Sequence, residues 1–163
     1  MKQNPQVVIR NDLKPGDAGY IIYLHGYLYS KEYGFDSNFE PYVAIPLAEF
    51  VMSHTDREKI WIVEREKEIV GSVAIVRYSD QLAQLRWLLL HPKIRGFGIG
   101  KNLVEEGIAF CRDCGYSSLF LWTVDILKEA TQLYQSIGFK LTEQKTHEIW
   151  GIELTEQRYE LVL

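Results

Sequence analysis

The sequence contains little cysteine, which limits the redox and metal chemistry open to it. Its two cysteines, Cys111 and Cys114, have the spacing C-x-x-C and fall late in a predicted helix. A redox pair normally uses a helix N-terminus to lower the thiol pKa, and a structural zinc site would need two further ligands at similar spacing. We therefore interpret both cysteines as small core hydrophobes, and we expect no metal site.

Long basic runs and long apolar runs are missing as well. Acidic and basic residues are mixed along the chain and the formal net charge is -4, which argues against a nucleic-acid partner. No apolar run approaches the length of a membrane span, and residues 1–10 are too short and too polar for a signal peptide. We expect a cytoplasmic protein with no membrane partner.

The composition is otherwise that of a folded domain. The chain has 163 residues, of which 47% are hydrophobic, so it can bury a full core, and its length suits a single domain over residues 1–163. Hydrophobic periodicity and turn residues predict the elements in this order: a strand at 7–10, a helix at 17–30, a loop at 29–42, a second helix around residues 39–50, strands at 60–64, 69–78 and 82–90, a helix at 99–114, a strand at 119–123, a helix at 127–137 and two strands around Gly151. Strand, helix and strand over residues 82–123 imply a right-handed crossover between parallel strands.

Three glycines alternate between a predicted strand and a predicted helix. Gly96, Gly98 and Gly100 allow the backbone N–H groups to approach a ligand closely, and the helix dipole adds partial positive charge. Such a loop suits a phosphate, and Arg95 and Lys101 on either side would add charge-assisted contacts.

The sequence patterns of two other phosphate-binding loops do not match this segment. A simple tight turn that binds no ligand remains an alternative. A P-loop needs G-x-x-x-x-G-K followed by Ser or Thr, whereas here Arg95 takes the place of its first glycine and Asn102 follows Lys101. A dinucleotide fingerprint needs G-x-G-x-x-G in the first crossover of a doubly wound sheet, and here the spacing is G-x-G-x-G with most of a domain before it.

Two segments resemble motifs of the GNAT superfamily of N-acetyltransferases. Leu88-Leu89-Leu90-His91-Pro92 and Arg95-Gly96-Phe97-Gly98-Ile99-Gly100 look like its acyl-CoA motif, and Leu133-Tyr134-Gln135-Ser136-Ile137-Gly138-Phe139 matches its Leu-Tyr-x-x-x-Gly-Phe motif. The resemblance implies an α/β fold with a mixed, mostly antiparallel central sheet, flanked by helices, in which one parallel strand pair splays apart. His25-Gly26-Tyr27-Leu28-Tyr29 followed by Glu32-Tyr33-Gly34 is similar to a branch often fused to MarR-type regulators; with no winged helix present, we expect a free-standing catalytic domain.

The resemblance also implies a cofactor site. In the superfamily the pantetheine arm of acetyl-CoA lies beside the end of the central strand, and the pyrophosphate meets the glycine loop. Acetyl-CoA is therefore the expected cosubstrate, and its expected binding residues are Leu88, Leu89, Leu90, Arg95, Gly96, Phe97, Gly98, Ile99, Gly100 and Lys101.

Catalysis in such a site is mainly positioning and proton transfer. The motif makes Tyr134 the expected proton donor to the departing thiolate, and Glu32 and Asp125 are candidates for the base, although either could be a solvated carboxylate or a cap. Many relatives carry an asparagine seven residues before the motif tyrosine, where this chain has Leu127.

The acceptor is less defined by the sequence. The residues expected to wall its site, unless they are ordinary core or rim aromatics, are His25, Tyr29, Tyr33 and Trp122. Three functions stay open: acetylation of a small-molecule amine, acetylation of a protein lysine or N-terminus, and acyl-CoA sensing without turnover. A closed aromatic pocket would favour the small amine and a shallow groove would favour a protein; a homodimer is neither indicated nor excluded.

Overall fold

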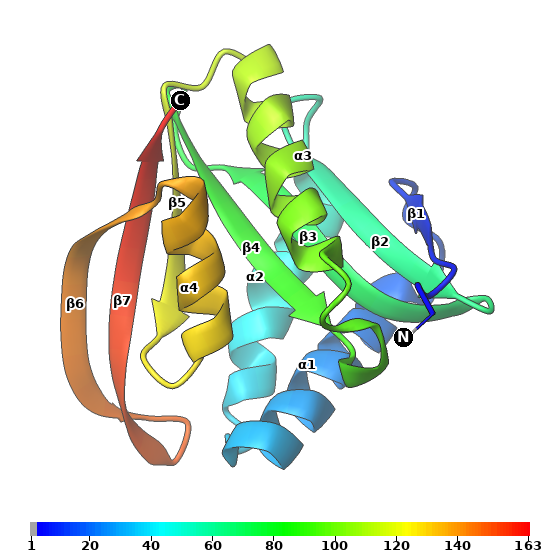
Figure 1. Cartoon of the computed structure of the whole chain (residues 1–163), viewed down its shortest axis with the longest axis vertical. Helices are drawn as coiled ribbons and strands as arrows, with labels where there is room; N and C mark the ends of the chain where they lie inside the picture. Colours follow the sequence, from blue (N-terminus) through cyan, green and yellow to red (C-terminus); the bar gives the residue numbers. More distant parts are fainter. Residues whose placement is uncertain (1–2) are drawn as a thin grey trace.

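The computed structural model describes residues 3–163, which form a seven-stranded mixed sheet with helices on both faces (Figure 1). The strand order is β1-β2-β3-β4-β5-β7-β6, and all neighbouring strands are antiparallel except β4 and β5. The elements in chain order are β1 (Val8–Arg10), α1 (Asp17–Tyr33), α2 (Phe39–Ser53), β2 (Lys59–Arg65), β3 (Glu68–Arg77), β4 (Leu82–Leu90), a 3-10 turn (Pro92–Ile94), α3 (Ile99–Asp113), β5 (Ser118–Val124), α4 (Lys128–Ile137), β6 (Lys140–Ile149) and β7 (Ile152–Val162). The predicted fold class is confirmed, including the parallel pair.

The loop predicted over residues 29–42 is wrong for most of its length. Helix α1 continues to Tyr33 and ends at Gly34, whose left-handed backbone (φ 75°) lets its N–H donate to the carbonyl of Ser30. Helix α2 begins at Phe39, so only five residues connect the two helices. The aromatic residues that resembled a loop pack on one another instead, as the ring centroids of Tyr29 and Phe39 lie 4.9 Å apart.

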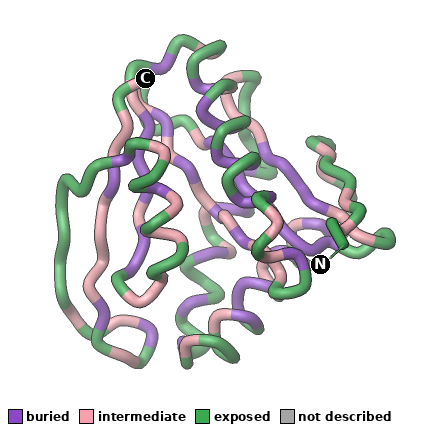
Figure 2. Tube along the Cα trace, in the orientation of Figure 1, coloured by how far each residue is buried: buried purple, intermediate pink, exposed green. Residues whose placement is uncertain are grey.

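Each face of the sheet has its own hydrophobic core. Helices α3 and α4 cover one face, where Leu103, Ile108 and Cys111 are buried, and α1 and α2 cover the other, where Ile21 and Leu47 are fully enclosed. The interpretation of Cys111 as a core hydrophobe is thus confirmed, and burial raises the pKa of its thiol to about 12. Figure 2 shows that β6, at the edge of the sheet, is exposed along most of its length. No helix within residues 3–163 is long and apolar enough to cross a membrane.

The parallel strands β4 and β5 stay together only at their beginnings. Residues 82–84 pair with 118–120, and beyond these residues β4 and β5 do not pair with each other. On the other side of β4, the register with β3 shifts between Ser72 and Ala74, which leaves two β4 residues opposite one β3 residue, and Trp87 there has a positive φ of 52°. Beyond this bulge Leu88 and Leu90 are only partly buried, so one face of this strand end is left open.

Candidate active site

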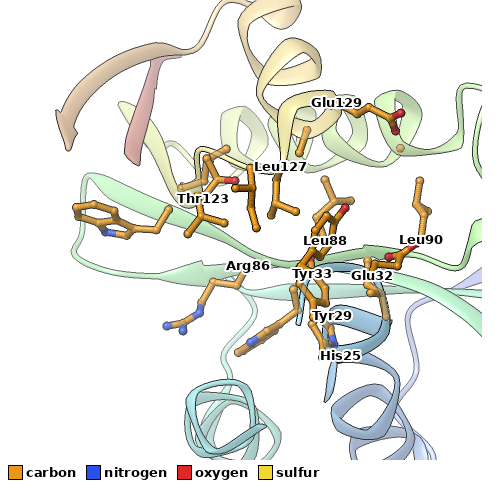
Figure 3. Close-up of a pocket in the computed structure, with 18 of the residues that line it drawn as sticks. His25, Tyr29, Glu32, Tyr33, Arg86, Leu88, Leu90, Thr123, Leu127 and Glu129 are labelled. Atoms are coloured by element: carbon orange, nitrogen blue, oxygen red, sulfur yellow. The ribbon is translucent and has the colours of Figure 1, made fainter. Parts of the chain in front are cut away.

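A cavity of about 530 Å³ opens where β4 and β5 separate (Figure 3). Its walls come from α1, α2, β4, β5, α4 and the glycine loop, so segments far apart in the sequence meet there. The volume is in the range of small-molecule sites, and the lining combines apolar and aromatic side chains with a few charged groups. The splaying of one strand pair therefore creates a binding site at the centre of the sheet.

The glycine loop forms one end of this cavity and presents unpaired amides. Gly96 and Gly98 have φ values of 82° and 79°, a conformation that side chains disfavour, and a Cβ at either position would meet no atom within 4 Å. Gly98 is the N-cap of α3, and no side chain within residues 3–163 caps this helix end. The first turn of α3 therefore leaves N–H groups and a positive dipole end free for an anion.

The other residues predicted to bind the cofactor divide into two groups. Leu88, Leu89, Leu90, Arg95, Gly96 and Gly100 line the cavity, whereas Phe97, Gly98, Ile99 and Lys101 do not. Ile99 is buried in the core and Phe97 packs against that core, so these two side chains anchor the loop. Gly100 has a packing role, since a Cβ there would lie 3.0 Å from Cδ1 of Leu90.

Arg95 joins the glycine loop to the end of α1. Its guanidinium donates from Nη1 and Nη2 to the two carboxylate oxygens of Glu32, at 2.6 and 2.9 Å, and from Nε to the carbonyl of Leu90 at 2.8 Å. The hydrogen bonds that Arg95 donates to Glu32 raise the pKa of Arg95 above its ordinary value. Glu32 and Leu90 lie together at one end of the cavity in Figure 3. Arg95, which was predicted to bind the cofactor, and Glu32, which was a candidate for the base, thus form an ion pair with each other.

Tyr134 projects from α4 into the same cavity. Its side chain is 5% exposed, its ring packs edge-on against Phe139, and burial raises the pKa of its hydroxyl well above the ordinary value. No residue between 3 and 163 forms a hydrogen bond with that hydroxyl. The phenol is therefore protonated at neutral pH and has its proton available for a ligand.

His25 and Tyr29 form the wall on the α1 side. Their rings are stacked, with centroids 5.9 Å apart, and both line the cavity. Burial lowers the pKa of His25 to about 4, so the imidazole is neutral, and its Nδ1–H donates to the carbonyl of Ile21 over 2.8 Å. In this tautomer Nε2 is an acceptor. Tyr33 and Trp122 also line the cavity, as expected.

Asp125, a predicted candidate for the base, also lies outside the cavity wall. It does not line the cavity; it is exposed, and its Oδ1 accepts a hydrogen bond from the backbone N–H of Thr155 at 3.0 Å. The expectation that this carboxylate lies at the slot is wrong, because the chain turns there to begin α4 and the side chain binds β7 instead. This carboxylate does not cap α4 either, because the N-cap of that helix is Leu127 and no side chain forms a hydrogen bond there.

Several residues that line the cavity were not predicted from the sequence, and Arg86 is the most notable of them. It lies on β4 between buried residues and lines the cavity together with Trp87, Thr123 and Glu129. A lone charge inside an apolar strand was a signal for it, since arginine is rarely buried without a partner. Thr123 and Glu129 carried no such signal.

Comparison with known proteins places this geometry in a family. The model of the acetyltransferase (GNAT) family matches residues 21–139. This chain belongs to the GNAT family. The match includes α1, the glycine loop and Tyr134, and so covers most of the cavity wall described above.

Individual relatives agree with this assignment. Human N-acetyltransferase 8B is 40% identical over 96 residues, which cover 56% of this chain and 42% of the relative. An N-acetyltransferase of Schizosaccharomyces pombe is 34% identical over 122 residues, covering 73% of this chain and 74% of the relative. A Salmonella typhimurium protein described as an acetyltransferase and solved with its cofactor acetyl-CoA has a TM-score of 0.76 at 16% identity, over 96% of this chain and 93% of that one. The chain thus spans less than half the length of the human relative.

Proposed function

We propose that this GNAT domain transfers the acetyl group of acetyl-CoA to the primary amine of a small molecule. The observation that carries the proposal is the arrangement of one cavity, with free amides of the glycine loop at one end and the hydroxyl of Tyr134 in its wall. Bound acetyl-CoA would supply an activated thioester. The uncapped start of α3 and the open space at Gly96 and Gly98 fit its pyrophosphate.

A small acceptor is favoured over a protein by the aromatic wall. The cavity reaches under α1 and α2, where it is lined by Tyr29, Phe35, Phe39, Trp87 and Trp150. Phe35, Phe39, Trp87 and Trp150 are each less than 10% exposed, so this wall is built from closely packed aromatic side chains. A concave site with an aromatic wall suits a small molecule.

Proton movement in this scheme involves two groups. The amine attacks in its neutral form, so that the carbon–nitrogen bond forms as the carbon–sulfur bond breaks, and Tyr134 donates its hydroxyl proton to the departing sulfur. The attacking nitrogen then releases one proton, which restores the hydroxyl of Tyr134. Because burial disfavours an ionised Tyr134, this return must follow at once.

Glu32 is better placed to position Arg95 than to act as the base. Both of its carboxylate oxygens accept hydrogen bonds from the guanidinium, which fixes the carboxylate beside Arg95. We therefore propose that Glu32 holds Arg95 against the carbonyl of Leu90, beside the loop. The initial proton of the amine is then lost to solvent.

The loop assignment is tested by a matched pair of glycine variants. Gly98 and Gly115 have nearly the same positive φ, 79° and 80°, and a Cβ meets nothing within 4 Å at either position. Gly98→Ala and Gly115→Ala should therefore lose similar stability through backbone strain. Calorimetry should show acetyl-CoA binding weakened at least tenfold by Gly98→Ala alone. Equal affinity of the two variants would remove the loop from the site, and absence of thiol release with every amine tested would refute turnover.

A further inference from the structure

Arg86 projects on the opposite face of the sheet from the side chains expected to meet the cofactor. Leu85, its neighbour in β4, packs into the core under α3 and α4, so Arg86 points to the side of α1 and α2. The bulge at Trp87 then restarts the alternation, which returns Leu88 and Leu90 to the α3 side. Figure 3 shows Arg86 at the end of the cavity away from Glu32 and Leu90.

The distance along the strand separates Arg86 from the phosphate site as well. Four residues of extended chain between Arg86 and Leu90 span about 13 Å. The glycine loop follows Leu90, so the pyrophosphate site and the guanidinium of Arg86 lie at different ends of the cavity. The negative charges of acetyl-CoA are on its phosphates, so an anion that meets Arg86 would belong to a second ligand.

The charge of Arg86 is not compensated within residues 3–163. No carboxylate forms an ion pair with it and no hydrogen bond engages its guanidinium; Tyr42 and Glu49 act on it only over longer distances. Arg95, another cation of the lining, is paired with Glu32. Glu156, a carboxylate of the lining, forms a hydrogen bond of 2.6 Å with Nε2 of His147.

The surroundings of Arg86 offer donors and aromatic surface but few acceptors. Its guanidinium lies 5.3 Å from the ring centroid of Trp87, and the enclosed indole N–H of Trp87 has no acceptor within residues 3–163. Burial of a cation without an anion costs free energy, which a bound anion would recover. A carboxylate fits the guanidinium fork with two parallel hydrogen bonds.

We propose that Arg86 binds the carboxylate of the acceptor, so that the domain acetylates the amino group of an amino acid with an apolar or aromatic side chain. The inference rests on the proposed transferase function of the same cavity. The guanidinium holds the carboxylate at the α2 side, the aromatic wall takes the side chain, and the amine is left to face the opening between β4 and β5.

Matched substrates test the proposal directly. Thiol release is measured with phenylalanine, tyrosine, tryptophan and leucine, and with the corresponding amines that lack the carboxylate, such as phenethylamine and tyramine. The parent should favour at least one amino acid over its decarboxylated partner by 10-fold or more in kcat/KM. Equal or better turnover of every decarboxylated amine would overturn the proposal.

Variants of Arg86 then test whether this residue causes the preference for amino acids over their decarboxylated amines. Arg86→Gln should raise KM for the preferred amino acid roughly 10- to 100-fold, the range for a lost charged hydrogen bond, and leave its decarboxylated partner unaffected. Arg86→Lys should restore part of the preference because it keeps the charge. Arg112→Gln, on the exposed face of α3 outside the cavity, should change neither substrate. A loss in Arg86→Gln that is equal for both substrates, at unchanged melting temperature, would contradict a carboxylate site.

A binding measurement separates this proposal from the transferase function. If no amine releases thiol, the proposed function fails, and the carboxylate site is then tested alone with 3-phenylpropionate by calorimetry. Binding that weakens at least tenfold in Arg86→Gln but not in Arg112→Gln would support the site. Absent binding, or equal binding by parent and Arg86→Gln, would refute it whatever the catalytic result.

Discussion

Replacing Tyr134 by phenylalanine tests the proposed mechanism at a single atom. The change keeps the ring and its packing on Phe139, whose centroid lies 5.8 Å away, and removes only the hydroxyl. Because that hydroxyl has no hydrogen-bond partner within residues 3–163, its loss leaves no buried group unsatisfied. The free energy of unfolding should therefore change by less than about 0.5 kcal/mol.

The effect on turnover should be much larger than the effect on stability. A lost general acid slows chemistry by about 100-fold at the lower end of its usual range, which corresponds to about 2.7 kcal/mol of activation free energy. Affinity for acetyl-CoA should stay within about threefold, since the proposed phosphate contacts are with the glycine loop and not with this hydroxyl. Burial raises the pKa of Tyr134, so the donor stays protonated through pH 9 and should add no alkaline limb to the rate profile.

The assay is single-turnover thiol release with a competent amine, so that chemistry limits the rate. Circular dichroism and a urea melt establish that the variant is folded. Tyr159→Phe is the matched control, because Tyr159 is 2% exposed and lies outside the cavity. An unchanged rate in Tyr134→Phe would remove this residue from proton transfer, and a parallel loss of acetyl-CoA affinity would make it a binding residue.

Two further predictions concern the α1 side of the cavity. His25 is neutral in the folded protein because burial lowers its pKa to about 4. In the unfolded chain it takes up a proton near pH 6.5. The free energy of unfolding should therefore fall by about 3 kcal/mol as the pH drops from 6.5 to 4. Urea unfolding at several pH values measures this loss of stability, which should be absent in His25→Asn. If the free energy of unfolding depends on pH equally in both proteins, the buried imidazole is not neutral. Glu32→Gln should raise KM for acetyl-CoA about threefold through a less ordered Arg95, while kcat and its pH profile stay as in the parent. Loss of the acidic limb of that profile, with no such loss in Glu129→Gln at the cavity rim, would make Glu32 the base.

Local sequence patterns alone predicted most of the fold. Alternation and helical spacing predicted the hairpin of β2 and β3, helix α3 and the parallel pairing of β4 with β5, because each of these depends on short-range periodicity and on the handedness of a crossover. The sequence also located the glycine loop, since positive φ at Gly96 and Gly98 is a local demand that glycine meets. The motif around Tyr134 carries the resemblance to the family within seven consecutive residues.

Tertiary structure decided which of these residues act together. The pairing of Arg95 with Glu32 joins residues 63 positions apart, and no periodicity carries information about such a contact. The bulge at Trp87 turns Arg86 and the following leucines to different faces, which a strand read by simple alternation would not show. Asp125 left the site for the same reason, because the turn into α4 directs its carboxylate to β7. The sequence thus determined most of the elements and the glycine loop, whereas the end of the cavity that contains Arg86 depended on how separate elements pack, which only long-range contacts set.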